Sequence, residues 1–310
     1  MQRLTLERGV PESLKGSIVA LGNFDGFHLG HQAVVGRALA RAFHERRPAI
    51  VATFDPHPVK FFKPDVPPFR LTSLDQRERL FAHAGADAML VFRFDKGLAT
   101  TSAEDFVAEI LAGQIGAAGV VTGDDFTFGR GRKGNVDALV DLGANFGIAA
   151  EAVAPVLLDG IRISSGRIRE ALEAGDTGTA THLLSRDYAI EGVVQRGDAR
   201  GRELGYPTAN LELGDYQRPK YGIYAVRVTL DDGSEHPGVA SLGVRPTFDP
   251  PRELLEAHLF GFDCDLYGRK IEVALHAFIR EEKKFADVET LVAHMRDDEA
   301  QARRLLALAT

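Results

Sequence analysis

The sequence predicts two domains: an α/β domain built on a parallel sheet at residues 1–185, and an antiparallel β-barrel with a terminal helix at residues 186–310. Three observations support this prediction. The 310 residues are 45% hydrophobic, which is enough for two separate cores. Up to about residue 156, β-type runs alternate with helix-type stretches, as in a parallel sheet covered by helices. After Arg186, short strand candidates are separated by Gly, Pro and Asp, as in an antiparallel barrel.

The first half contains five strand candidates, in the order SIVAL, AIVATF, AMLVFRF, GVVTG and IAAEAVAPV. A helix-type stretch follows each of the first four. Thr101 with Glu104, and Ser73 with Gln76, have the spacing of a capping box, which satisfies the N–H groups at a helix start. These pairs predict two helix starts. A further helical stretch, RIREALEAGDTGTATHLLSR, closes this half.

The second half contains six strand candidates: YAIEGVVQRG, PTANLEL, YGIYAVRVTL, HPGVASLGVR, LLEAHLFGF and KIEVALHAFIR. Near the C-terminus, Val288, Leu291, Val292 and Met295 recur at helical spacing. We therefore expect one terminal helix to pack against the barrel with this apolar face.

Composition limits the partners and the compartment. The formal net charge is -7, so no broad basic surface is expected and nucleic acid is not a predicted partner. Cys264 is the only cysteine, which excludes an intrachain disulfide and a multi-cysteine zinc site and suits a reducing compartment. The sequence contains no apolar run of about 18 residues and no export signal. We expect a cytoplasmic protein with small-molecule substrates and no membrane partner.

The segment GNFDGFHLGH, residues 22–31, lies where the first strand turns into its helix. Ligands of open parallel sheets bind at such turns. Gly22, Gly26 and Gly30 let the backbone approach a ligand or adopt a positive φ, and the helix start offers N–H groups to an anion. His28 and His31, three residues apart, can donate hydrogen bonds to phosphate oxygens. The segment therefore predicts a phosphate-binding turn that lacks a P-loop lysine.

Other interpretations of these residues stay open. His28 and His31 could be ordinary surface or capping residues, or a metal pair, although the sequence identifies no third ligand. GRGRKG matches G-x-G-x-x-G, with Glu151 about 20 residues beyond its second glycine, as a dinucleotide site requires. However, the strand GVVTG ends well before Gly129, and three basic residues in the loop favour a phosphate ligand.

Four motifs in order carry a family resemblance. GNFDGFHLGH resembles the H-x-G-H signature of the nucleotidyltransferase superfamily. Together with FDPHP (54–58), GDDFTFGRGRKG (123–134) and SSGRIREAL (164–172), it resembles the adenylyltransferase half of bacterial bifunctional riboflavin kinase/FAD synthetases. The resemblance implies a Rossmann-like fold in which His28 and His31 hold the ATP phosphates and stabilise charge as pyrophosphate leaves. The family usually has Ser or Thr where this chain has Gly166.

The same resemblance implies further contacts. Arg167 and Arg169 are available to the β- and γ-phosphates at a helix start. Without the other motifs, Ser164 could be a plain N-cap, and Phe126 and Phe128 could be core, because residues two apart on a strand share a face. The candidate nucleotide- and flavin-binding residues are Gly22, Phe24, Asp25, Gly26, Asp55, Asp125, Phe126, Phe128, Arg130, Ser164 and Ser165.

A second dense motif, GVVQRGDARGRELGYPTANLEL, lies in the other half. Its glycines form a flexible arch, and the Thr208 hydroxyl and Asn210 amide oxygen can bind Mg²⁺, which then takes its anionic ligands from ATP. Alone, PTAN could be a turn and the glycines barrel corners. The stretch resembles the riboflavin kinase signature G-x-x-x-G-R-x-L-G-[FY]-P-T-A-N. The candidate binding residues here are Gly197, Arg202, Gly205 and Pro207, with Thr208 and Asn210 as metal ligands.

The kinase resemblance continues through YGIYAV, GVRPTF, LLEAHLF, DLYGRKI and FIREEKKF. It implies that Glu256 deprotonates the riboflavin 5′-hydroxyl, a poor nucleophile that needs a base. Glu256 could instead be a solvent-facing strand carboxylate, and Glu253 is the nearest competing candidate. Ser241, where the family often has Asn, and Cys264 depart from the family pattern.

The sequence thus predicts an enzyme that makes FMN from riboflavin and Mg-ATP, then joins AMP from a second ATP to FMN and releases pyrophosphate. The second step attacks with a phosphate that is already an anion, so it needs alignment and charge stabilisation more than a base. Two alternatives are a chain with only one live activity and a flavin-binding sensor without turnover.

Overall fold

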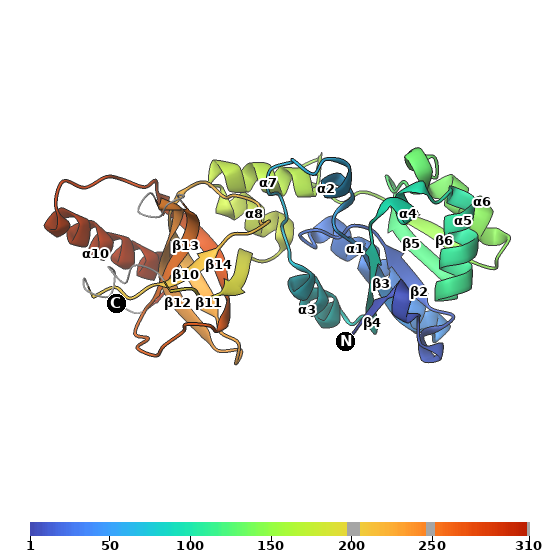
Figure 1. The fold of residues 1–310 in the computed structure, drawn as a ribbon, viewed down its shortest axis with the longest axis horizontal. Helices are drawn as coiled ribbons and strands as arrows, with labels where there is room; N and C mark the ends of the chain where they lie inside the picture. Colours follow the sequence, from blue (N-terminus) through green and yellow to red (C-terminus); the bar gives the residue numbers. More distant parts are fainter. Residues whose placement is uncertain (197–204, 246–251, 309–310) are drawn as a thin grey trace. The chain divides into compact units, whose positions relative to one another are not determined.

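The computed structural model describes residues 1–196, 205–245 and 252–308 (Figure 1). The chain packs as two compact units. One contains Met1–Pro67 and Leu74–Ser164, and the other contains Pro68–Ser73 and Ser165–Thr310. Residues 68–73 and 165–185 therefore pack with the second unit, although the sequence places them in the first predicted domain. The functional boundary between residues 185 and 186 stays a prediction.

The first unit is built on a six-stranded parallel sheet with the order β1-β4-β3-β2-β5-β6. This confirms the predicted α/β domain. The edge strand β1 was not predicted, because its four residues include only one buried side chain. The strands are β1 (Gln2–Thr5), β2 (Ile18–Leu21), β3 (Ala49–Asp55), β4 (Ala88–Arg93), β5 (Gly119–Gly123) and β6 (Ala149–Val153).

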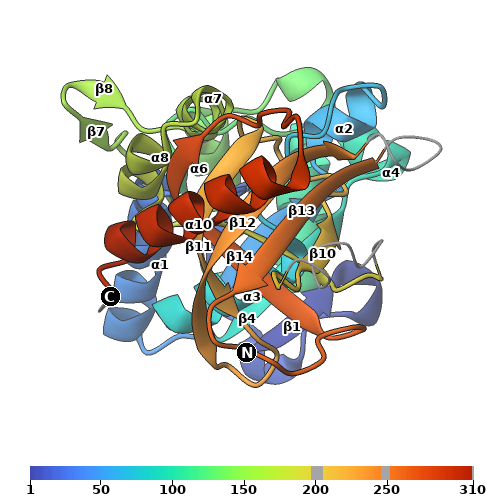
Figure 2. The ribbon, with the colours of Figure 1, turned by 90° about the vertical axis from the view of Figure 1, so that its left-hand side faces the viewer.

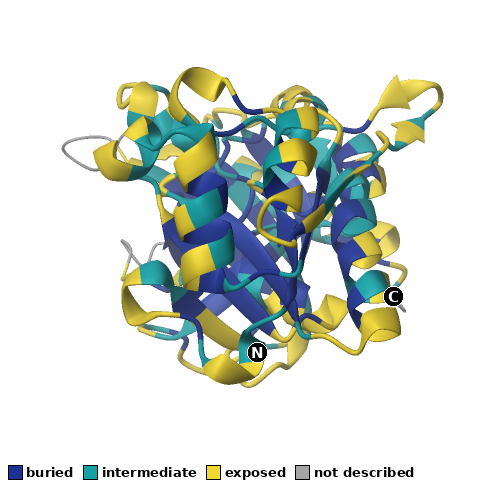
Figure 3. Cartoon of the chain, turned by 90° about the vertical axis from the view of Figure 1, so that its right-hand side faces the viewer, coloured by how far each residue is buried: buried dark blue, intermediate teal, exposed yellow. Residues whose placement is uncertain are grey.

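Helices cover both faces of this sheet, so its central strands are apolar on both sides. In β2, Ile18 and Ala20 join one core cluster, and Val19 and Leu21 join the other. Figure 3 shows the buried strands behind helices whose outer surfaces are exposed. The helical segments are α1 (Leu29–Glu45), α2 (Pro58–Phe62), α3 (Leu74–Ala84), α4 (Lys96–Thr100), α5 (Ala103–Asp105), the π-helix η3 (Phe106–Ile115) and α6 (Val136–Ala144). Short 3₁₀ turns and a small hairpin complete the unit: η1 (Leu6–Arg8), η2 (Glu12–Leu14), η4 (Arg130–Arg132), β7 (Leu157–Leu158) and β8 (Ile161–Arg162).

One of the two predicted helix starts is wrong by a residue. Ser102, not Thr101, is the N-cap of α5, and its side chain accepts a hydrogen bond from the Asp105 amide at 3.0 Å. Thr101 instead ends α4, and its hydroxyl donates to the Gly97 carbonyl at 3.0 Å. Both Thr101 and Ser102 could serve as the N-cap. Because Thr101 is already used to end α4, Ser102 caps α5. The other helix, α3, begins at Leu74, directly after Ser73.

The second unit contains an antiparallel sheet with the order β10-β13-β12-β11-β14-β9. A backbone hydrogen bond of 2.9 Å from Gln195 to Asn210 joins its two ends, so the sheet is a nearly closed barrel, as predicted. The predicted helical stretch before it is divided at Gly175, whose φ is +80°. The elements are α7 (Ser165–Ala174), α8 (Thr177–Leu184), β9 (Tyr188–Val193), β10 (Ala209–Glu212), β11 (Gly222–Thr229), β12 (Glu235–Arg245), β13 (Arg252–Leu259) and β14 (Lys270–Arg280).

The terminal helix α10 (Val288–Leu305) lies across β11, β12 and β14, which confirms the predicted packing (Figure 2). The predicted contact face is only partly correct, since Val288 is 59% exposed. Ala302 and Leu306 are buried instead. One helical turn before Ala302, the Asp298 carboxylate accepts two hydrogen bonds from Arg280 of β14, at 2.8 and 2.6 Å. An apolar pattern does not reveal this anchor, because the buried side chain is charged.

Asp298→Ala should loosen α10, because it leaves the half-buried Arg280 without its carboxylate partner. We expect the free energy of local opening of α10 to fall by about 2–4 kcal/mol, measured by hydrogen exchange of its amides. Asp297→Ala, at the exposed neighbouring position, is the matched control and should change this energy by less than about 0.5 kcal/mol. Equal effects of the two substitutions would show that the ion pair does not anchor the helix.

Candidate active sites

The loop between β2 and α1 lies at the point where the order of the strands reverses. β3 lies on one side of β2 and β5 on the other, and such switch points are where open sheets bind ligands. The loop backbone has positive φ at Phe24 (49°), Gly26 (87°) and Phe27 (43°). Both phenylalanine rings are buried and meet Phe81 of α3 edge-on. Packing of these rings thus holds the loop in conformations that non-glycine residues rarely adopt.

The two histidines lie together at the start of α1. His28 is the N-cap of the helix, and its Nδ1 accepts a hydrogen bond from the His31 amide at 3.2 Å. Their rings stack with centroids 3.6 Å apart and an interplanar angle of 15°. Because Nδ1 accepts, the neutral His28 ring carries its proton on Nε2, which can donate to a phosphate oxygen. The capping interpretation and the phosphate interpretation of His28 are therefore compatible.

Two of the three loop glycines make room for aromatic rings. A Cβ atom at Gly30 would lie 3.1 Å from Cε1 of His28, and one at Gly22 would lie 3.0 Å from the Phe24 ring. Gly26 is the one with a positive φ. The packing or the backbone conformation of residues 22–31 thus explains why each of these positions is a glycine.

Arg77 of α3 braces this loop and was not predicted from the sequence. Its guanidinium donates to the Thr53 hydroxyl at 2.9 Å and to the Asn23 carbonyl at 3.3 Å. The Thr53 hydroxyl also donates to the Asn23 carbonyl, at 2.7 Å. Arg77 is 3% exposed, and it lies one helical turn before the buried Phe81. The sequence did contain a signal for its burial, because Arg77 lies four residues before Phe81 and therefore on the same, apolar face of α3.

The other candidates of the first unit follow strands β3 and β5. Asp55 ends β3 and is half-buried. Asp125 follows β5, is exposed, and forms an ion pair of 3.0 Å with Arg162. Phe128 lies in the core against Phe106, and Phe126 stacks on Phe128 at a centroid distance of 5.8 Å while half-buried. This packing favours the core interpretation for Phe128. Two further candidates remain. Asp25 is buried in the loop after β2, and Arg130 is exposed in η4.

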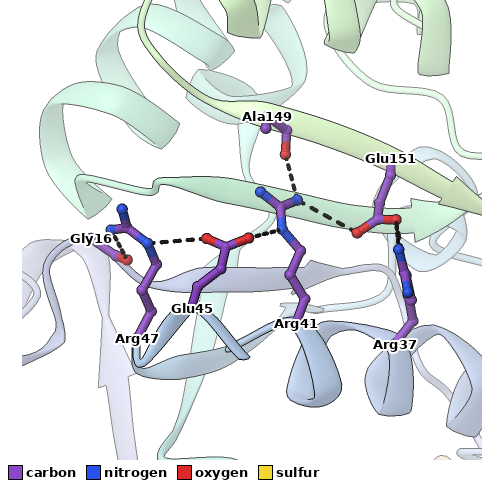
Figure 4. A network of polar contacts seen from close by, with 7 residues as sticks. All are labelled: Gly16, Arg37, Arg41, Glu45, Arg47, Ala149 and Glu151. Carbon is purple, nitrogen blue, oxygen red and sulfur yellow. Dashed lines mark hydrogen bonds and ion pairs between the residues drawn. The ribbon is translucent and has the colours of Figure 1, made fainter. Parts of the chain in front are cut away.

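The dinucleotide interpretation of GRGRKG is not supported. Glu151, the proposed ribose ligand, lies in β6 and pairs with Arg37 at 2.8 Å and with Arg41 at 3.5 Å (Figure 4). Arg41 also donates to the Ala149 carbonyl at 2.8 Å, so this network ties α1 to β6. Phe128 and Gly134 exchange backbone hydrogen bonds, so the glycine segment is a closed loop and not a turn from strand to helix.

The serines and arginines of SSGRIREAL fall on both sides of the division between the units. Ser164 ends the first unit, and Ser165 begins α7 in the second. On α7, Arg167 is half-buried. Arg169 donates to the Phe69 carbonyl at 2.8 Å, and its guanidinium lies 5.1 Å from the centre of the Phe69 ring. Sequence reasoning missed Phe69, which is 100 residues away in the chain.

The second candidate site lies on neighbouring strands of the barrel. Asn210 on β10 is directly opposite Glu256 on β13. The Asn210 side chain is buried, and its Oδ1 has no hydrogen-bond partner among the described residues. Thr208, just before β10, is half-buried, and Gly205 has a φ of +83°. Gly197 and Arg202 lie outside the described residues, and Pro207 is exposed.

The structure distinguishes the two glutamates of β13. They are three residues apart, so they point to opposite faces of the strand. Glu253 accepts hydrogen bonds from Arg218 at 2.9 Å and from Tyr221, and the bond from Arg218 lowers its pKa. Burial and then the bond to Glu253 raise the pKa of Tyr221 to about 12. Glu253 thus belongs to a structural network with Arg218 and Tyr221.

Glu256 belongs to a different network. Its Oε2 accepts a hydrogen bond of 2.8 Å from Arg245. Arg245 also donates to Glu282 at 2.6 Å and to the Ser241 hydroxyl at 2.7 Å. Ser241, which departs from the family pattern, therefore helps to hold the arginine that contacts the candidate base. Sequence reasoning did not identify Arg245 or Glu282.

Within residues 1–196, 205–245 and 252–308, no three His, Cys, Asp or Glu side chains are grouped so that they could hold a metal ion. The interpretation of His28 and His31 as a metal pair therefore lacks a third ligand in those ranges. None of the helices in the same ranges combines the length and the apolar character needed to cross a bilayer.

Comparison with known proteins gives two family matches. The model of FAD synthetase matches residues 10–167, and the model of riboflavin kinase matches residues 184–306. The bifunctional riboflavin kinase/FMN adenylyltransferase of Pseudomonas fluorescens is 41% identical over 294 residues, which cover 94% of each chain. The protein of the same name from Escherichia coli K12 is 37% identical, over 95% of this chain and 94% of its own.

A solved structure is also similar along the whole chain. It is a crystal structure from Streptococcus pneumoniae whose title describes a macrolide-efflux protein. Its sequence is 31% identical, its TM-score is 0.87, and the match covers 98% of this chain and 99% of that one. Both units therefore have counterparts within a single polypeptide of solved structure.

Gly26→Ala should destabilise the loop after β2, because alanine is strained at a φ of +87°. We expect the free energy of unfolding to fall by about 1–2 kcal/mol in urea titrations. The matched control is Gly36→Ala, inside α1, where a Cβ atom meets open space. That substitution should raise the free energy of unfolding by about 1 kcal/mol. Two changes of the same sign would contradict the account of this loop.

Proposed function

The chain belongs to the bifunctional riboflavin kinase/FMN adenylyltransferase family, and from this premise we propose which residues carry each activity. The kinase phosphorylates riboflavin to FMN with ATP, and the adenylyltransferase joins FMN to AMP from a second ATP, which gives FAD and pyrophosphate. One observation carries the residue-level proposal. The two sets of residues lie in different family matches: His28, His31 and Arg167 within residues 10–167, and Thr208, Asn210 and Glu256 within residues 184–306, while Arg169 lies two residues beyond the first match.

For the kinase, we assign Thr208 and Asn210 to Mg²⁺ and Glu256 to the base. The buried Oδ1 of Asn210, with no partner among the described residues, suits a hard cation that takes neutral oxygen ligands. When bound, Mg²⁺ neutralises charge on the phosphates of ATP. Glu256 accepts the proton of the riboflavin 5′-hydroxyl. Arg245 holds its Oε2 at 2.8 Å, and so orients the carboxylate.

For the adenylyltransferase, His28 and His31 donate to phosphate oxygens, together with the N–H groups at the start of α1. The support is the stacked arrangement of the rings and the acceptor role of His28 Nδ1, which leaves Nε2 as the donor. Arg167 and Arg169 are assigned to the β- and γ-phosphates by family resemblance. No general base is assigned, because the attacking phosphate of FMN is already an anion.

The remaining assignments rest on resemblance and on position in the fold. Gly22, Phe24, Asp25, Gly26, Ser164 and Ser165 are proposed for the nucleotide of the adenylyltransferase. Asp55, Asp125, Phe126 and Arg130 are proposed for its flavin, with Phe128 supporting Phe126 from the core, and Gly197, Arg202, Gly205 and Pro207 for the kinase. We also propose a cytoplasmic location, for which the single Cys264 is the support.

Substitutions at the two sites should have separable effects. His28→Asn keeps a side chain that caps helices well but removes the imidazole. FAD formation from supplied FMN should therefore slow by about 100- to 1000-fold while FMN formation continues. Asn210→Ala should slow riboflavin phosphorylation to a similar extent and leave the adenylylation of supplied FMN intact. Product chromatography measures both steps, and loss of both activities from either substitution would argue for one shared site.

Glu256→Gln should lower kcat for riboflavin phosphorylation by about 100- to 10,000-fold, because the amide cannot accept the hydroxyl proton. Glu253→Gln is the matched control on the other face of β13 and should leave kcat within a few-fold of the parent. The reverse pattern would identify Glu253 as the base.

A further inference from the structure

Another polar side chain of β13, that of His258, lies on the same face as Glu256. His258 is two residues further along the strand, and its Nδ1 lies 2.9 Å from the carbonyl oxygen of Pro207. A carbonyl only accepts hydrogen bonds, so Nδ1 carries the proton and donates. The imidazole also meets the Tyr206 ring edge-on, with centroids 5.0 Å apart. His258 therefore contacts both residues that lead into Thr208.

These contacts continue to the terminal helix. The His258 ring lies 6.0 Å from the Phe260 ring, and the Arg303 guanidinium of α10 lies 4.5 Å from the centre of the Phe260 ring. Tyr206 is buried, and burial, followed by the charge of Glu299 on α10, raises its pKa. The segment before Thr208 is thus packed between β13 and α10.

The two proposed metal ligands are held in different ways. Asn210 lies within the β10–β13 ladder, where the strand register places it opposite Glu256. Thr208 precedes the ladder, whose first residue is Ala209, so the register does not hold it. The Pro207 carbonyl is the backbone group directly before Thr208. The hydrogen bond from His258 therefore holds the backbone just before Thr208, where the strand ladder does not reach.

We propose that His258 is a positioning residue for riboflavin phosphorylation: it holds the Pro207 carbonyl and so keeps the Thr208 hydroxyl in place relative to Asn210. This inference rests on the proposed function of Thr208 and Asn210 as Mg²⁺ ligands. His258 acts through the backbone of its neighbour and does not itself contact substrate. Residues that orient metal ligands typically change metal affinity or activity by about 10- to 100-fold when they are removed.

Three substitutions separate the hydrogen bond from simple packing. Leucine fills the space but donates nothing. Asparagine carries an amide nitrogen at the δ position, as histidine carries Nδ1, and glutamine carries it one bond further out. We expect His258→Leu and His258→Gln to raise the Mg²⁺ concentration for half-maximal FMN formation by about 10-fold or more, with kcat at saturating Mg²⁺ within about threefold of the parent. His258→Asn should restore the parent value to within about threefold.

A second readout does not depend on activity. Hydrogen exchange of the peptide that contains residues 205–212 should be faster in the leucine and glutamine variants and close to the parent in the asparagine variant. Adenylylation of supplied FMN by the same samples should stay unchanged, which verifies that the other site is intact, and a parent-like kcat at saturating Mg²⁺ verifies that the barrel is folded. If His258→Leu fails to fold, the comparison of His258→Asn with His258→Gln tests the role of the hydrogen bond.

The outcomes are distinguishable from failure of the proposed function. Unchanged Mg²⁺ dependence and exchange in the leucine and glutamine variants, while Asn210→Ala still raises the Mg²⁺ requirement, would overturn the role of His258 alone. A fall in kcat without a change in Mg²⁺ dependence would overturn it as well, as would failure of asparagine to restore the parent value. If Asn210→Ala also leaves the Mg²⁺ requirement unchanged, the metal assignment itself is wrong and this proposal falls with it.

Discussion

Burial of β2 on both of its faces is the constraint on which the proposed adenylyltransferase site depends. A strand with helices on either side leaves the chain only the carboxyl edge of the sheet for its turn. The loop makes this turn with left-handed backbone at Phe24, Gly26 and Phe27, and the buried phenylalanine rings keep it there. His28 caps α1 with its Nδ1 bonded to the His31 amide, and the two rings stack. The loop thus fixes the position of the proposed phosphate donors, and such preorganisation is what stabilisation of a developing charge requires.

The proposed kinase site reaches the same result through strand register. Pairing of β10 with β13 places Asn210 opposite Glu256 without any contribution from a loop. Arg245 then orients the carboxylate of Glu256 from the neighbouring strand β12. A phosphoryl transfer to an alcohol needs a base as well as a cation site, and the proposed base Glu256 and metal ligand Asn210 lie on adjacent strands. The two proposed sites thus differ in the chemistry of the nucleophile and in how their residues are positioned, by a packed loop and helix start in the first unit and mainly by strand register in the second.

Local patterns predicted the strands of the two six-stranded sheets other than β1, the barrel and the terminal helix, because apolar periodicity reflects burial directly. The motifs also predicted the turn that holds His28, but not the strand pairing that places Asn210 opposite Glu256. What they did not predict are contacts between charged or polar residues far apart in the chain. Arg77 on Thr53, Arg280 on Asp298 and Phe69 on Arg169 are examples. A buried charge looks like a surface residue in a sequence until its partner is known, and no local spacing identifies that partner.

The central claim is that the chain uses two ATP molecules differently. The γ-phosphorus of one is attacked by riboflavin, and the α-phosphorus of the other is attacked by FMN. The most direct measurement supplies riboflavin and Mg²⁺ to the unmodified chain, in parallel with ATP labelled at the γ- or at the α-position, and separates the flavins over time. The account predicts that γ-label enters FMN first and then FAD, whereas α-label enters FAD alone. Appearance of α-label in FMN, or formation of FAD without γ-label, would contradict it.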